Sequence, residues 1–169
     1  MENWITTLGI IVTFIVGMLS LYISVRNTRK VTYINSITAS RIKWIDELRE
    51  DISEFCGLVE HYRVTDKIKA EVLRGIYENI DVLTFRIIFR LNRLGKIDKL
   101  IKSKIEFILQ NLDSDDEKPD KELEKLPELT QDLLKFEWER VKLESQKGIL
   151  TDDQKQKLIN NFLGGKYAD

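Results

Sequence analysis

The most apolar stretch of the sequence is residues 4–25, which contain no charged side chain. A helix of this length, rising about 1.5 Å per residue, crosses a hydrocarbon core of about 30 Å. Trp4 and Tyr22 lie near its two ends, where amphipathic rings favour the membrane–water interface. A basic cluster at residues 26–30 follows directly, and no lysine or arginine precedes the stretch. A cleavable signal peptide has the opposite order, with its positive charge before the apolar stretch. The pattern predicts a retained single-pass anchor, with its N-terminus outside and the following chain in the cytoplasm.

The small and polar residues of this anchor are not scattered around the helix. At about 100° per residue, six of them fall within a sector of roughly 80°. We refer to them as the polar stripe: Thr6, Gly9, Thr13, Gly17, Ser20 and Ser24. Two successive small-xxx-small steps within the stripe favour close helix contact, so we interpret it as a packing face between copies of the chain. The alternative is that the same face lines a narrow pore. Both interpretations require a homo-oligomer, such as a tetramer.

The rest of the sequence suits one helical domain. Both prolines lie within residues 119–127, and about 140 residues after the anchor are enough for a single core. The single cysteine, Cys56, excludes an internal disulfide and suits a reducing cytosol. A net charge of −1 gives no global sign of nucleic-acid binding, so any basic site must be local. We predict an all-α protein in which residues 1–30 form the anchor with its basic cluster and residues 31–169 form a cytosolic helical bundle.

The first cytosolic segment has a helical pattern with one interruption. Residues 31–38 are rich in β-branched side chains and fit either a short extended break or a continuation of the anchor helix. Residues 34–61 then carry apolar side chains at helical spacing. Arg41 interrupts this apolar seam, with Trp44 beside it, and an arginine there is unfavourable unless its charge is neutralised. Arg41 therefore either reaches solvent or a carboxylate of another helix, or it forms the base of an anion-binding site.

A second helix is predicted from a cap at Thr65 or Asp66 to about Leu94, where Gly95 ends it. One face of this helix is apolar along its length. A second apolar face lies on the opposite side: Val82, Phe85 and Phe89. The latter half of the helix is therefore either the centre of a bundle or a subunit contact.

The same helix carries the most concentrated basic feature of the cytosolic part. Arg86, Arg90 and Arg93 follow one another at spacings of four and three residues, and residues 82–97 contain no acidic side chain. Such a ridge is either a solvated face or a surface that binds phosphate groups through paired hydrogen bonds. Together with Arg41, these three arginines are the candidate ligand-binding residues.

Three further helices complete the predicted bundle. Residues 97–112 carry isoleucines at helical spacing. A fourth helix begins at Asp120 or at Pro127 and runs to Gln146, and Gly148 terminates it in the left-handed position that glycine favours. A capping box at residues 151–154 opens a last short helix.

The sequence contains no recognisable catalytic or metal-binding set. His61 and Cys56, the only histidine and the only cysteine, lie on one predicted helix and point about 140° apart, so they cannot form a nucleophile–base pair. The acidic run 113–121 has the spacing of a calcium loop, but Lys118 stands where the turn needs glycine. We therefore expect no catalytic residues, no metal site and no cofactor, and a protein that is not an enzyme.

Three longer stretches share a pattern with a known group of proteins. They are ITASRIKWIDELREDISEF (37–55), LTFRIIFRLNRLGKIDKLI (83–101) and LLKFEWERVKLE (133–144). Together they resemble short bacterial one-pass membrane proteins of antiphage abortive-infection systems, among them the Hailong membrane effectors. In that group the second stretch usually contains a Leu-Asn-Pro turn, whereas this chain has Arg93 in place of the proline. The resemblance implies an oligomeric, channel-like protein whose opening is controlled by a nucleotide or single-stranded DNA oligomer made by a partner nucleotidyltransferase.

We therefore expect a homo-oligomeric effector of the bacterial inner membrane. The polar stripe would line or gate a pore in the lipid bilayer, and the four candidate arginines would bind the anionic ligand that controls it. The alternative is a passive membrane-tethered helical adaptor that docks a protein partner without forming a pore. A third hypothesis is a membrane disruptor that needs no ligand.

Overall fold

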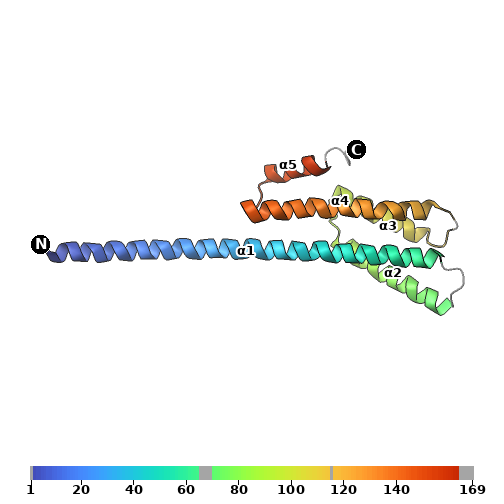
Figure 1. Cartoon of the computed structure of the whole chain (residues 1–169), viewed down its shortest axis with the longest axis horizontal. Helices are drawn as coiled ribbons and strands as arrows, with labels where there is room; N and C mark the ends of the chain where they lie inside the picture. Colours follow the sequence, from blue (N-terminus) through green and yellow to red (C-terminus); the bar gives the residue numbers. More distant parts are fainter. Residues whose placement is uncertain (1, 65–69, 115, 164–169) are drawn as a thin grey trace.

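The computed structural model describes residues 2–64, 70–114 and 116–163, and every regular element in these ranges is a helix. The helices are α1 (Glu2–Val64), α2 (Ala70–Arg90), α3 (Lys96–Gln110), α4 (Lys118–Lys147) and α5 (Asp152–Leu163). The predicted all-α class is confirmed. Figure 1 shows the N-terminal part of α1 as a long rod that leaves a bundle built from the other helices. The predicted cap at residues 65–66 lies outside the described residues.

One unbroken helix joins the apolar N-terminal stretch to the bundle. α1 has 63 residues, and at about 1.5 Å per residue it is about 95 Å long. Residues 31–38 are helical, because no glycine or proline in this segment ends the helix. Among the described residues, α1 is the one helix that is long and apolar enough to cross a membrane. No described residue of its most apolar part is buried inside the single chain.

The C-terminal half of α1 forms the spine of the bundle. It packs against both α2 and α4, while α3 and α5 pack against α4 (Figure 1). The predicted apolar seam supplies its buried residues: Ile45, Leu48, Ile52, Phe55 and Val59. They belong to one core with residues of α2, α3 and α4: Ile76, Ile80, Leu83, Ile87, Ile97, Ile101, Ile105, Ile108, Leu126, Leu129, Leu133, Leu134 and Val141. Each buried side chain of this size stabilises the fold by about 1.5–3 kcal/mol.

α2 ends four residues earlier than predicted, at Arg90, and Leu94 is exposed. The carboxylate of Asp98 accepts a hydrogen bond from the backbone N–H of Asn92 at 2.8 Å, and the Asn92 side chain accepts one from the N–H of Leu94 at 3.0 Å. Local bonds of this kind satisfy backbone groups outside a helix, so they favour a turn. Gly95 lies in this turn directly before α3, with extended backbone angles, and is therefore not the residue that ends α2.

The two ends of α4 follow the local sequence. The helix begins at Lys118, before both predicted starts, with Pro119 in its first turn, where the missing N–H needs no partner. Its last residue is Lys147, one beyond the predicted Gln146, and Gly148 follows with a φ of 82°, a positive value that favours glycine, as predicted. The predicted capping box is also confirmed, because the N–H of Thr151 donates to the Gln154 side chain at 3.0 Å and the N–H of Gln154 donates to Oγ1 of Thr151 at 3.4 Å.

Arg63, near the end of α1, is surrounded by described residues of the 111–120 region. The Nε of Arg63 donates to Oδ1 of Asp120 at 2.6 Å. The same guanidinium donates to four backbone carbonyls: those of Asn111, Leu112, Ser114 and Asp116. Beside it, the hydroxyl of Tyr62 donates to the carboxylate of Asp113 at 2.7 Å. The C-terminal end of α1 thus organises the end of the bundle that lies farthest from the rod.

Candidate functional site

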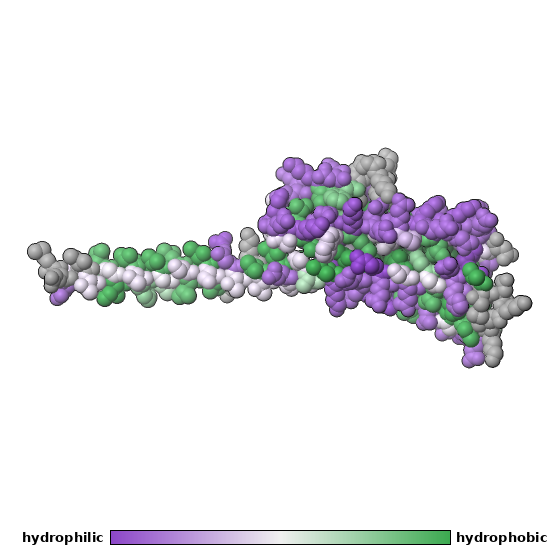
Figure 2. All heavy atoms as spheres, in the orientation of Figure 1, coloured by the Kyte–Doolittle hydropathy of each residue, from purple (hydrophilic) through white to green (hydrophobic). Residues whose placement is uncertain are grey.

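The polar stripe runs along one side of the exposed part of α1. Figure 2 shows it as a pale line between two rows of apolar side chains in green. A shallow groove on this side is lined by Thr6, Gly9, Ile10, Thr13, Phe14, Gly17, Met18 and Leu21. Ser20 and Ser24 come further along the helix and are also exposed. All six residues of the stripe are therefore open to contact from outside the chain.

No contact within the single chain requires glycine at the two glycine positions of the stripe. A Cβ atom at Gly9 or at Gly17 would meet no atom within 4 Å. The hydroxyl of Thr13 donates to the carbonyl of Gly9 at 2.8 Å, so it is satisfied within its own helix. Larger residues would fit the isolated helix at both glycine positions, and the small size of these residues has no explanation inside one chain.

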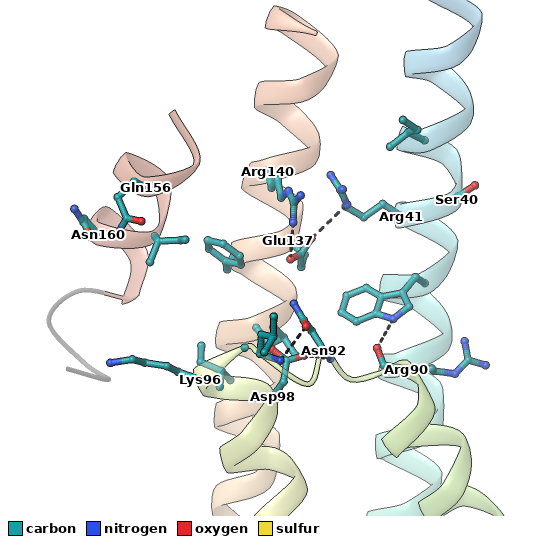
Figure 3. A pocket seen from close by; sticks show the side chains of 18 of the residues that line it. Ser40, Arg41, Arg90, Asn92, Lys96, Asp98, Glu137, Arg140, Gln156 and Asn160 are labelled. Carbon is teal, nitrogen blue, oxygen red and sulfur yellow. Dashed lines mark hydrogen bonds and ion pairs between the residues drawn. The ribbon is translucent and has the colours of Figure 1, made fainter. Parts of the chain in front are cut away.

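A pocket of about 980 Å³ lies in the bundle between α1, α4, α5 and the turn that joins α2 to α3. Its apolar walls include Ile37, Trp44, Leu133, Phe136 and Ile159. In Figure 3, Arg41 extends from α1 toward Glu137 of α4, while Gln156 and Asn160 belong to the neighbouring α5. A hollow of this size with apolar walls and a few convergent polar groups is typical of a small-molecule site.

Arg41 is held in this pocket by two carboxylates of α4. Its Nε lies 3.4 Å from Oε2 of Glu137, and its Nη1 donates to Glu144. Arg140 contacts the same two carboxylates, with Nη1 3.5 Å from Glu137 and Nε 3.2 Å from Glu144. We call these four residues the charge ring. The side chains of Arg41, Glu137 and Glu144 are only 17%, 15% and 12% exposed, so water screens their interactions weakly.

Burial makes two carboxyl groups of the pocket harder to ionise. The pKa of Glu137 is raised by burial, against the opposing effect of Arg140 and Arg41, and Asp98 adds to the increase. The pKa of Asp98 is itself raised by burial, although the N–H of Asn92 opposes this shift. A group that resists ionisation in this way takes up a proton readily when its cationic partner is removed.

Two arginines of the predicted basic ridge, Arg86 and Arg90, are paired with carboxylates of α1. Arg93 lies in the turn beyond the end of α2, so the ridge predicted on one helix does not extend to it. The Nη2 of Arg86 lies 2.6 Å from Oδ1 of Asp51, and the Nε of Arg90 lies 2.7 Å from Oδ2 of the same side chain. Arg90 also donates to Glu47. Asp51 is fully buried and could have been suspected from the sequence, because it stands beside Ile52 in the apolar seam, where a carboxylate needs a cationic partner.

The four candidate arginines do not converge on one place. Arg41 and Arg90 line the pocket, whereas Arg86 and Arg93 are not among its lining residues. Arg90 accepts a hydrogen bond there through its backbone carbonyl, from Nε1 of Trp44. Its guanidinium turns to α1, away from the charge ring (Figure 3). Arg41 is thus the candidate whose guanidinium reaches the pocket, and Arg140 joins it there, although sequence reasoning had not singled Arg140 out.

The second apolar face of α2 lies on the surface. Val82 and Phe85 are exposed, and Phe89 is 84% exposed. Of the two interpretations of this face, the centre of the chain's own bundle is therefore wrong. A subunit contact stays a prediction.

The one cysteine of the sequence is not an activated nucleophile. Burial, together with Glu60, raises the pKa of the Cys56 thiol to about 11, so the thiol stays protonated and is a poor nucleophile. Within the parts of the chain that the structure describes, no group of three or more His, Cys, Asp or Glu side chains could hold a metal ion. The pocket and the stripe are the features that carry a functional argument.

Comparisons with protein-family models, with curated proteins and with solved structures found no match to this chain.

Proposed function

We propose that this protein is a homo-oligomeric, single-pass effector of the bacterial inner membrane that forms a pore or ion channel under the control of an anionic ligand. The N-terminus lies outside, and the bundle lies in the cytoplasm. The observation that carries the proposal is the continuity of α1, which bears both the polar stripe and the pocket residue Arg41.

The stripe supports self-association. Glycines that the single chain does not need let two helix backbones approach closely, and hydroxyl groups can bond across such a contact. A lone helix in lipid gains nothing from small polar residues along most of its length. In an oligomer the same residues either pack copies together or line the path of ions.

The unbroken helix supports control by the bundle. Arg41 follows Ser24 by 17 residues, a distance of about 26 Å along the axis. A ligand that contacts Arg41 therefore acts directly on the helix that crosses the membrane. It shifts the pore between two states by the difference between its affinities for them, so the two states must differ at the pocket.

The resemblance to effectors of abortive-infection systems gives the proposal its biological setting. In that setting the ligand is a nucleotide or a single-stranded DNA oligomer, and a partner nucleotidyltransferase makes it during phage infection. Arg41 and Arg140, which meet in the pocket, can bind phosphate groups of such a ligand once these groups take the place of their carboxylate partners.

One observation favours a second candidate, a membrane-tethered adaptor without a pore. The exposed apolar face of α2, with Val82, Phe85 and Phe89, is the kind of surface that docks a protein partner. In an adaptor, the anchor supplies only location, and changes in the stripe leave partner binding intact.

The proposal is tested by adding bulk to the stripe. We expect the double variant Thr13→Leu, Gly17→Leu to lose ion flux from proteoliposomes and to shift to a smaller oligomer in detergent. Ile15→Phe adds bulk elsewhere on the same helix and should retain both properties. A wild type of single-subunit mass at every concentration, or unchanged flux in the double variant, would contradict the pore.

A further inference from the structure

We infer that the pocket binds an amphipathic anion with an apolar or aromatic body, and that this ligand replaces Glu137 and Glu144 as the partner of Arg41 and Arg140. The inference rests on the proposed function, because it names the ligand class and the exchange step of the same pocket. It concerns Glu137, Arg140 and Glu144 of α4, to which the sequence pattern assigned no role in binding.

The apolar walls of the pocket indicate that the ligand has an apolar or aromatic body. Trp44 of α1 and Phe136 of α4 contribute aromatic rings, and Ile37, Leu133 and Ile159 contribute aliphatic surface. A small hydrated ion gains little from such walls, whereas a flat apolar body gains free energy by burying its surface against them. The volume of about 980 Å³ is at the upper end of the range for drug-sized ligands.

The charge ring sets the charged group of the ligand. Arg41 and Arg140 are already paired, so a new anion reaches their guanidinium groups only by taking the place of a carboxylate. The ring has two positive and two negative groups and is therefore neutral before the exchange. An entering anion leaves an excess negative charge in a shielded site, which is unfavourable unless a proton is taken up.

Glu137 is the group placed to take up that proton. It faces Arg41 of α1, Asp98 of α3, and Arg140 and Glu144 of its own helix. The residues of α5 that line the pocket are Gln156, Ile159 and Asn160, none of which is charged. The pKa of Glu137 is already raised by burial, and loss of its arginine partners raises it further. Binding is thereby favoured as the pH falls.

The exchange also acts on the contact between α1 and α4. Arg41 precedes Ile45, the first buried residue of the α1 seam, so the charge ring joins the two helices at the edge of the core nearest the rod. Once the ligand holds Arg41, the two carboxylates no longer tie α4 to the helix that enters the membrane. The bound and free states therefore differ in the contact between α1 and α4. A ligand can shift a pore between two states only if the states differ at its binding site, and this contact supplies that difference.

The test uses Trp44 as a reporter on the full chain in lipid nanodiscs. Trp4→Phe and Trp138→Phe leave Trp44 as the one tryptophan, and naphthalene disulfonate serves as a probe with an aromatic body and charges that do not titrate near neutral pH. We expect saturable binding that tightens from pH 8 to pH 6, with a tenfold change per pH unit as the limit for one proton. In that background Glu137→Gln should bind more tightly at pH 8 and lose most of the pH dependence, and Arg41→Ala should weaken binding at least tenfold.

A matched control keeps the result specific. Glu124→Gln makes the same change on an exposed part of α4 and should bind like its parent. If Glu137→Gln does not fold, Glu144→Gln replaces it with the same expectation of tighter binding. No saturable binding would overturn the ligand class, and equal affinity at both pH values would overturn the exchange. Ion flux is not part of this readout, so binding without flux would contradict the pore and leave the exchange intact.

Discussion

The indole Nε1 of Trp44 donates a hydrogen bond to the backbone carbonyl of Arg90 at 2.9 Å, which ties the last residue of α2 to α1. The same indole forms a wall of the pocket, and the side chain of Arg90 binds Glu47 and Asp51 of α1. The end of α2, the pocket and the spine of the bundle therefore meet at one point. Changes at this point are expected to affect both the stability of the bundle and the pocket.

Trp44→Phe tests the contribution of this hydrogen bond. The substitution keeps an aromatic ring but removes the donor, so the Arg90 carbonyl loses its partner at the end of α2. We expect the unfolding free energy to fall by about 1 kcal/mol or more, measured by denaturant titration in detergent with circular dichroism. Trp138→Phe is the matched control on an exposed part of α4 and should change stability by about 0.5 kcal/mol at most. Equal stability of the two variants would show that the hydrogen bond contributes nothing.

Gly95→Ala tests the close packing of the turn between α2 and α3. A Cβ atom at Gly95 would lie 2.0 Å from Oδ2 of Asp98, and this carboxylate is the one that fixes the N–H of Asn92. We expect a loss of about 1–3 kcal/mol from the forced displacement. Gly75→Ala is the matched control inside α2, where a Cβ meets no atom within 4 Å, and it should gain up to about 1 kcal/mol from helix propensity. The same sign in both variants would contradict the assigned contact.

The features that the sequence predicted correctly depend on neighbours along the chain. The seam from Ile45 to Val59 is visible as a helical period, and its burial follows because no other face of that segment is apolar. Gly148 and the Thr151–Gln154 box act within a few residues, so their roles can be read from local spacing. α2 ends before the predicted Leu94 because Asp98, eight residues beyond Arg90, accepts a hydrogen bond from the backbone of the turn.

The partners of the charged residues could not be predicted in the same way. The sequence predicts that Arg41 needs either a carboxylate or an anion as its partner. Glu137 lies more than ninety residues further along the chain, so no local sequence pattern identifies it as that partner. The ridge on α2 had no acidic neighbour in its own segment, and its counterion, Asp51, comes from α1. Such pairs are fixed only when the helices pack, so the sequence indicates that partners are needed without identifying them.

Asp51→Asn tests whether the ion pairs of Asp51 with Arg86 and Arg90 stabilise the fold. The substitution leaves Arg86 and Arg90 facing a neutral amide at a fully buried position. We expect a loss of up to about 3 kcal/mol, because Arg90 is largely shielded while Arg86 is half-exposed and loses less. Asp46→Asn is the matched control, since Asp46 pairs with Arg49 on the solvent side of the same helix and its loss should change stability by less than about 1 kcal/mol. If thermal unfolding of both variants matches the wild type, the ridge is not held by Asp51.

Alkaline pH should loosen the end of the bundle around Tyr62. The hydrogen bond to Asp113, followed by burial, raises the pKa of Tyr62 to about 12, whereas an unfolded tyrosine titrates near 10. A raised pKa in the folded state gives a contribution to stability that is complete below about pH 10 and is lost as the pH rises toward 12. We expect the unfolding free energy of the wild type to decline more steeply over this window than that of Tyr62→Phe, because the variant has no phenol to titrate. Denaturant titrations at matched pH values, paired with tyrosinate absorbance, measure the difference, and parallel declines in the two proteins would remove Tyr62 as its cause.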